Sequence, residues 1–174
     1  MLASCLRVFA MLQQGSFDLG LLSAAQVDRH GNLNSTALGS YEKPKVRLVG
    51  SGGAHDIAVL ARAAVILMPH DPRRFVQEVD FATSPGLYGS TGNGTGAARD
   101  SGPRCVVTPR ARFTFEAGEL TLDALVDGVD ERTALEGFGW SVPCATRLGQ
   151  LTPLSDSEIA VASDVLESWG RDAV

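Results

Sequence analysis

The spacing of apolar residues changes along the chain, and each change predicts a different element. Near the start, apolar side chains recur every three or four positions, as on one face of a helix. These residues are Leu2, Leu6, Phe9 and Leu12. Gly15 is placed to end that helix, because glycine readily adopts the left-handed conformation that closes many helices. Residues 18–27 are then largely apolar, which predicts a mostly buried strand, and the letters DRHGN predict the turn that leaves it.

The stretch VRLVGSGGAHDIAVLARAAVILMPHD predicts a strand, a glycine turn, a helix and a second strand. The apolar run 46–49 is the first strand, and residues 64–68 are the second, which Pro69 ends. Residues 53–62 between them have helical spacing. Two β-branched-rich strands joined by such a helix predict a βαβ unit with a right-handed crossover.

The second half of the chain predicts mainly short strands. Residues 75–81 alternate apolar and polar side chains, as a half-exposed strand does. A meander of three further strands is predicted at 105–108, 112–116 and 119–125. Helices are predicted at 130–136 and 156–167, the last with an S-x-x-E capping box made by Ser155 and Glu158.

These elements predict one α/β domain over residues 1–174, with an open, mostly parallel sheet, an antiparallel extension and flanking helices. A length of 174 residues suits one well-buried domain. Residues 86–102 contain G-x-G-x-G, but no apolar strand leads into them and no helical pattern leaves them. They therefore favour a surface loop over a nucleotide-binding loop.

Composition and charge exclude several classes of protein. The net charge of −5 comes from charges scattered along the chain, which argues against nucleic acid or an anionic membrane as partner. No apolar run approaches the roughly 20 residues of a membrane span. Cys5, Cys105 and Cys144 lie far apart, which favours reduced thiols in the cytoplasm, and buried packing for Cys5 and Cys105. The histidines have no metal-ligand spacing, so no metal site is predicted.

The glycine turn 50–53 is a candidate binding site. A glycine loop that opens a helix exposes backbone N–H groups, and these favour a negative charge. That charge could be a phosphate or an oxyanion that exists only during a reaction, and a tight turn without any ligand is the third possibility. The loop alone leaves the three open.

Three stretches in this order and spacing carry a resemblance to a known family. They are AAQVDRHGNLNST (24–36), VRLVGSGGAHDIA (46–58) and MPHDPRRFVQEVDFATSPG (68–86). Together they resemble the β-type subunit of family I CoA-transferases, of the glutaconate CoA-transferase kind. The resemblance implies the open α/β fold of that family and a heteromer with an α-type subunit. It also implies acyl-CoA as substrate, so that coenzyme A is part of the substrate and no cofactor is permanently bound.

The resemblance gives the glycine turn a role. In the family a glutamate attacks the acyl-CoA and later carries CoA as an enzyme-bound thioester, which is covalent catalysis. The attack creates a tetrahedral oxyanion that backbone N–H groups stabilise. By resemblance, this oxyanion and CoA loop is formed by Ser51, Gly52, Gly53 and Ala54.

Five polar residues are candidates for binding the substrate: Gln26, Asn32, Asn34, Arg73 and Arg74. The two arginines could hold a CoA phosphate or a carboxylate through the planar guanidinium group. An ion pair with Asp71 or Glu78 explains them equally well. Asn32 and Asn34 could orient the substrate, or they could bond their own backbone in a turn.

The glutamate motif of the family, E-S-G or E-N-G, does not occur in the sequence, and none of the glutamates matches it. No catalytic residue is therefore assigned to this chain. Met1 aligns with the interior of the family pattern, so we expect the domain to be incomplete at its N-terminus, and the chain alone to be inactive and no clean monomer. An acyl-CoA hydrolase subunit and a non-catalytic structural subunit remain the alternatives.

Overall fold

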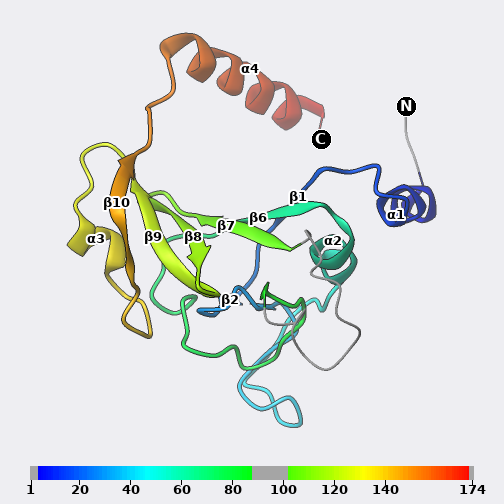
Figure 1. The fold of residues 1–174 in the computed structure, drawn as a ribbon. Helices are drawn as coiled ribbons and strands as arrows, with labels where there is room; N and C mark the ends of the chain where they lie inside the picture. Colours follow the sequence, from blue (N-terminus) through cyan, green and yellow to red (C-terminus); the bar gives the residue numbers. More distant parts are fainter. Residues whose placement is uncertain (1–3, 88–101, 173–174) are drawn as a thin grey trace.

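A computed structural model describes residues 4–87 and 102–172, and its centre is a twisted six-stranded sheet in the order β1-β6-β7-β8-β9-β10 (Figure 1). The strands are β1 (Leu19–Leu22), β6 (Ala63–Leu67), β7 (Pro103–Val107), β8 (Ala111–Glu116), β9 (Glu119–Leu125) and β10 (Cys144–Gln150). β1, β6 and β7 are parallel, β8 is antiparallel to both of its neighbours, and β10 is parallel to β9. This confirms the open α/β sheet with mostly parallel pairs.

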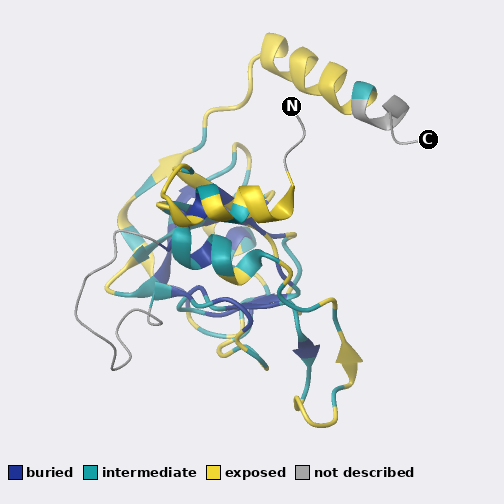
Figure 2. Ribbon diagram, turned by 90° about the vertical axis from the view of Figure 1, so that its right-hand side faces the viewer, coloured by how far each residue is buried: buried dark blue, intermediate teal, exposed yellow. Residues whose placement is uncertain are grey.

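Two small antiparallel sheets lie beside the main one. β2 (Gln26–Val27) pairs with β3 (Leu33–Asn34), and β4 (Ala37–Leu38) pairs with β5 (Val46–Arg47). The β4–β5 pair projects from the body as an arm (Figure 2). Because β4 begins just after β3, the arm starts close to the polar residues of β2 and β3.

Four helices accompany the strands: α1 (Cys5–Gln13), α2 (Ala54–Leu60), α3 (Glu131–Leu135) and α4 (Asp156–Asp172). α1 ends as predicted, because Gly15 has φ +74° and its N–H donates to the Leu12 carbonyl at 3.0 Å, while Ser16 N–H donates to Met11 at 3.0 Å. α2 packs closely on β1, since Gly20 lacks the Cβ that would overlap Ile57.

The core lies between the inner face of the main sheet and the segments that cover it. Leu22, Ile66 and Val106 lie in register on β1, β6 and β7 and are buried. Phe113 and Leu122 continue this face on β8 and β9. From the other side the buried side chains are Val27, Leu33, Phe75 and Ala58. One contiguous apolar cluster therefore fixes the strand ends that carry the polar residues.

The predicted βαβ unit is partly wrong. α2 and β6 form as expected, but residues 46–49 do not enter the main sheet: only Val46 and Arg47 are extended, and they pair with β4. Val46 is 47% exposed and Val49 is 99% exposed, so the apolar letters do not mark a buried strand here. The strand that pairs parallel with β6 is β1. The crossover therefore runs from β1 through the small sheets and α2.

Other expectations divide in a similar way. The 105–125 meander, α3, α4 and the capping box are confirmed, with Glu158 accepting the Ser155 N–H at 2.8 Å. The single strand predicted at 18–27 is wrong, because β1 and β2 belong to different sheets. Residues 75–81 are not a strand: Phe75 makes one isolated bridge to Val27, and bends follow. The G-x-G-x-G stretch lies almost wholly outside the described residues.

Apolar side chains also lie on the surface. Leu19, Leu21 and Leu67 are exposed on β1 and β6. α4 stands away from the body and is exposed along most of its length (Figure 2). Its exposed apolar residues are Ile159, Val161, Val165 and Leu166. Across the described ranges, none of the helices has the length and apolar character needed to cross a membrane.

Candidate functional site

The glycine turn adopts a conformation that explains two of its glycines. Gly50 has φ +87° and Gly52 has φ +49°, where other residues are strained, and no atom lies within 4 Å of where a Cβ would stand on either. Gly53 differs, because a Cβ there would come within 2.6 Å of the Phe9 ring on α1. Space is therefore open around Gly52, whereas Gly53 gives the chain's own first helix room to pack.

The turn leaves backbone N–H groups available. Gly50 N–H donates to the Ser35 carbonyl at 2.8 Å and Ala54 N–H to the Ser51 carbonyl at 2.8 Å. Across the described residues, the N–H groups of Ser51, Gly52 and Gly53 have no protein acceptor. Three consecutive donors therefore remain for solvent or a ligand. α2 has only seven residues, so any attraction of the turn for a negative charge would come from these donors more than from the dipole of the helix.

An open hollow of about 570 Å³ lies next to the turn. Its lining residues are Ser23, Ala24, Ala25, Ser35, Arg47, Leu48 and Val49. The first three directly follow β1, and the last two directly precede Gly50. The hollow thus lies at the carboxyl end of a parallel strand, where open α/β sheets bind ligands.

The guanidinium of Arg47 is the charged group of this hollow. It lies 4.8 Å from the centre of the Tyr41 ring and donates to the Tyr41 carbonyl at 3.2 Å. Tyr41 in turn stacks on Phe81 with ring centres 4.9 Å apart. The cation is therefore held over an aromatic pair at the edge of the hollow.

Gln26 and Asn34 lie side by side, but their polar atoms are occupied by protein partners. The Asn34 amide donates to Gln26 Oε1 and to the Ala37 carbonyl, each at 2.7 Å, and its oxygen accepts two backbone N–H groups. Gln26 also donates to Asp80 at 3.0 Å. Both amides are buried. In the structure these two side chains hold β2 and β3 together. Contact of either one with a substrate stays a prediction.

Asn32 lies in a different place from Asn34. Its amide donates to Asp28 at 2.9 Å and its oxygen accepts the Gly86 N–H at 2.8 Å. Asp28 is buried and also accepts the backbone N–H groups of His30 and Asn32. This polar turn lines a second hollow of about 520 Å³ with Arg29, Gln77 and Glu78. Asn32 is therefore separated from the lining of the first hollow.

The two arginines have separate environments. Arg73 is exposed and binds Asp71, with Nη2 and Oδ2 2.7 Å apart, and this partner lowers the pKa of Asp71 to about 2. Arg74 instead turns inward and donates to the Ala24 carbonyl at 3.0 Å. Of the two, Arg74 is in contact with the lining of the first hollow. Ligand binding by either residue stays a prediction.

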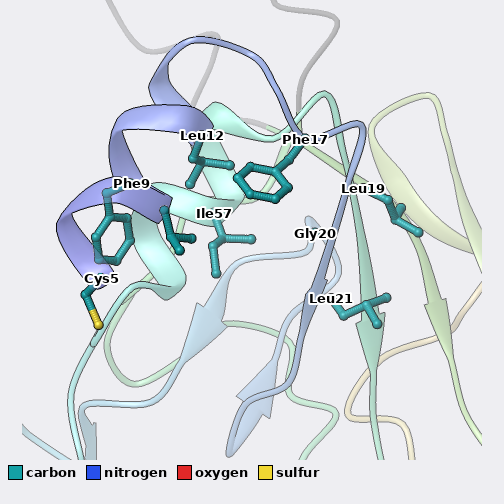
Figure 3. Close-up of a pocket in the computed structure, with 9 residues that line it drawn as sticks. Cys5, Phe9, Leu12, Phe17, Leu19, Gly20, Leu21 and Ile57 are labelled. Atoms are coloured by element: carbon teal, nitrogen blue, oxygen red, sulfur yellow. The ribbon is translucent and has the colours of Figure 1, made fainter. Parts of the chain in front are cut away.

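A third hollow, of about 340 Å³, lies between α1, β1 and α2 (Figure 3). Phe9, Leu12, Phe17, Leu21 and Ile57 are among the side chains that line it. Cys5 reaches its edge and is exposed, so the prediction of a buried Cys5 is wrong. The lining is almost wholly apolar, and among the described residues no titratable group except this thiol contributes to it. Among the described residues, its lining therefore offers an acyl group no carboxylate and no charged partner.

His70 lies shortly after the end of β6, and both of its ring nitrogens have polar contacts. Its Nδ1 lies 3.2 Å from Thr108 Oγ1 and its Nε2 lies 3.2 Å from the Glu136 carbonyl oxygen. Burial lowers the pKa of His70. Within the described ranges no three metal-ligating side chains gather at one place, so the structure assigns no metal site.

Two residues that sequence reasoning did not single out lie at the base of the glycine turn. Ser35 Oγ donates to the Gly50 carbonyl at 2.9 Å, and Thr83 Oγ1 accepts the Ser35 N–H at 2.9 Å. Both occur in stretches that carry the family resemblance, 24–36 and 68–86. Their place in these stretches was the only sign in the sequence that could have pointed to them, because nothing in the local pattern distinguishes either hydroxyl.

The structure thus places a strand-end hollow beside a glycine turn in which three N–H groups have no acceptor among the described residues. Residues 1–99 match the family model for coenzyme A transferase, and the chain belongs to that family. It is 37% identical over 152 residues to the beta subunit of 3-oxoadipate CoA-transferase from Pseudomonas knackmussii, covering 85% of this chain and 58% of that protein. It is 40% identical over 100 residues to the beta subunit of glutaconate CoA-transferase from Acidaminococcus fermentans, covering 56% of this chain and 37% of that protein.

The fold agrees with this assignment. The crystal structure of glutaconate coenzyme A-transferase from Acidaminococcus fermentans superposes with a TM-score of 0.81 at 28% identity, covering 92% of this chain and 65% of that chain. The chain thus spans less than two thirds of the length of these relatives. The family match includes all three stretches that suggested the family.

Proposed function

We propose that this chain acts as the β-type subunit of a heteromeric CoA-transferase, which moves CoA between a small acyl-CoA and a carboxylic acid. The relatives are named for 3-oxoadipate and glutaconate, so a dicarboxylic or oxo acid is the proposed substrate class. The partner in this proposal is an α-type subunit. The observation that carries the proposal is the row of N–H groups at Ser51, Gly52 and Gly53, which lies beside the strand-end hollow and has no acceptor among the described residues.

The proposed chemistry uses these N–H groups as an oxyanion site. When a nucleophile attacks the thioester carbonyl, the oxygen gains negative charge, and donors already in position stabilise that charge without reorganising. One such donor contributes about 2.7–4 kcal/mol to the transition state, or 10²–10³ in rate. The open space around Gly52 would let the acyl group approach the backbone.

The attacking carboxylate is not assigned to this chain. Among the described residues, no glutamate lines the hollow beside the turn. Glu78 lines the second hollow, the one at Asp28. The proposed contribution of this chain is therefore the oxyanion loop and part of the CoA channel.

The test is an exchange assay on the complex as purified from its own cells, with the second chain identified by intact mass. CoA esters are followed by mass spectrometry, with succinyl-CoA as donor and 3-oxoadipate or glutaconate as acceptor. New CoA ester of the acceptor supports the proposal. Thioester loss without an acceptor product would instead support the hydrolase subunit, and unchanged thioester the structural subunit.

A single methyl group tests the role of the turn. Gly52→Ala places a Cβ in the open space beside the free N–H groups, and we expect kcat/KM to fall on the order of tenfold to hundredfold. The matched control is Gly128→Ala, because Gly128 also has positive φ and open space but lies in the turn before α3. Equal activity of the two variants would contradict an oxyanion role for the turn.

A further inference from the structure

The glycine turn is fixed at its first residue by a pair of hydrogen bonds to Ser35. Gly50 N–H donates to the Ser35 carbonyl at 2.8 Å, and Ser35 Oγ donates back to the Gly50 carbonyl at 2.9 Å. The two residues are far apart in the sequence, and the β4–β5 arm lies between them. Ser35 therefore determines where the turn begins.

Ser35 is itself held by Thr83. The Ser35 N–H donates to Thr83 Oγ1 at 2.9 Å, and the same oxygen lies 2.7 Å from Thr36 Oγ1. Thr83 is only 8% exposed, so water cannot readily replace these contacts. Its own backbone is anchored, since its N–H donates to the Leu33 carbonyl at 2.8 Å.

Thr83 also reaches the far end of the turn. Its carbonyl oxygen lies 3.3 Å from Nδ1 of His55, the second residue of α2. His55 N–H is 3.3 Å from Ser51 Oγ, which closes the turn on that side. One buried residue thus contacts the segments on both sides of the N–H groups of residues 51–53.

We propose that Thr83 and Ser35 are positioning residues that hold the glycine turn so that the N–H groups of Ser51–Gly53 stay aimed at the reacting carbonyl. This rests on the proposed acyl-transfer function of the turn. The hydroxyl of Thr83 acts through Ser35 and does not touch substrate. Displacement by about 1 Å can cost on the order of a hundredfold in rate, so the clamp need move only slightly to matter.

The test compares three variants of the purified complex. Thr83→Val removes the hydroxyl while keeping the shape, and Thr83→Ser restores the oxygen. Thr121→Val is the control, since Thr121 is also buried and donates to the Glu119 carbonyl at 3.1 Å on β9. We expect Thr83→Val to lower kcat about tenfold or more with little change in KM, Thr83→Ser to recover most of it, and Thr121→Val to leave both unchanged.

Hydrogen exchange of the Gly50 amide gives a readout that does not depend on activity. Loss of the clamp should speed this exchange in Thr83→Val and not in Thr121→Val. If the wild-type complex moves no CoA, the proposed function fails, and faster exchange at Gly50 still supports the clamp. Unchanged exchange overturns the clamp. Faster exchange with an unchanged kcat in an active complex overturns its catalytic role.

Discussion

Gly86 is the position where one added carbon should lower the stability of the fold most, because it would meet backbone atoms. Gly86 is buried against the turn that follows β2. A Cβ on it would overlap the His30 carbonyl oxygen and lie 2.6 Å from the Asn32 nitrogen. These are backbone atoms, which cannot rotate away as a side chain can. The 83–87 segment, which includes Thr83, would have to separate from the turn.

The cost of Gly86→Ala follows from two contributions. Overpacking of a well-packed site costs about 1–3 kcal/mol. Separation also breaks the hydrogen bond from Gly86 N–H to Asn32 Oδ1, which is 2.8 Å long and contributes about 1 kcal/mol. A total of about 3 kcal/mol corresponds to a Tm lower by roughly 6–12 °C for a chain of this size.

Thermal and urea unfolding followed by circular dichroism measure this loss. Gly128→Ala is again the control, because its Cβ meets open space and its positive φ alone costs about 1–2 kcal/mol. We expect Gly86→Ala to be clearly less stable than Gly128→Ala. Two variants with the same midpoint would refute the argument that backbone contact makes Gly86 necessary.

Two further predictions concern titratable groups. Burial lowers the pKa of His70 from 6.5, so the folded chain favours neutral imidazole. Its contribution to stability is complete above pH 6.5 and is lost as the pH falls through the lower folded value. His70→Gln should therefore flatten the decline in unfolding free energy as the pH falls below 6.5, and parallel curves for the two proteins would contradict this. Burial, and then the 3.2 Å hydrogen bond to Glu131, raise the pKa of Cys144 to about 11. Cys144 and Cys5 are both exposed, so we expect the raised pKa to make iodoacetamide alkylate Cys144 more slowly than Cys5, as peptide mass spectrometry would show. Glu131→Gln should speed the reaction at Cys144, and no change would disprove the role of the carboxylate.

The elements that could be predicted from the sequence are those whose signals are local. The end of α1 at Gly15 and the capping box of α4 depend on neighbours within five residues. The β8–β9 hairpin is equally local. β10 was missed because most of its side chains are exposed and its letters, CATRLGQ, do not alternate. It is a strand because β9 offers it a parallel edge, which no local pattern reports.

The residues of the site also fall into those that the sequence predicts and those that it does not. The glycine turn could be found from its letters and from the family resemblance, while Arg47 and Thr83 could not. Thr83 matters because the segments near residues 35 and 55 both contact it, and Ser35 in turn holds Gly50. Such convergence is a property of the tertiary fold. The amides of Gln26 and Asn34 illustrate the reverse case, because their types suggested ligands whereas their partners are protein atoms.

The paired bonds between Ser35 and Gly50 also have an evolutionary consequence. They close the chain at the base of the β4–β5 arm, so the arm is a loop whose ends are already joined. The entropy of closing such a loop grows slowly, by about 0.6 kcal/mol for each doubling of its length. Residues can therefore be gained or lost at the tip, around residues 42–44, without shifting the turn below. Across related sequences the length of this arm should vary freely, while the spacing from Gly50 to α2 stays constant.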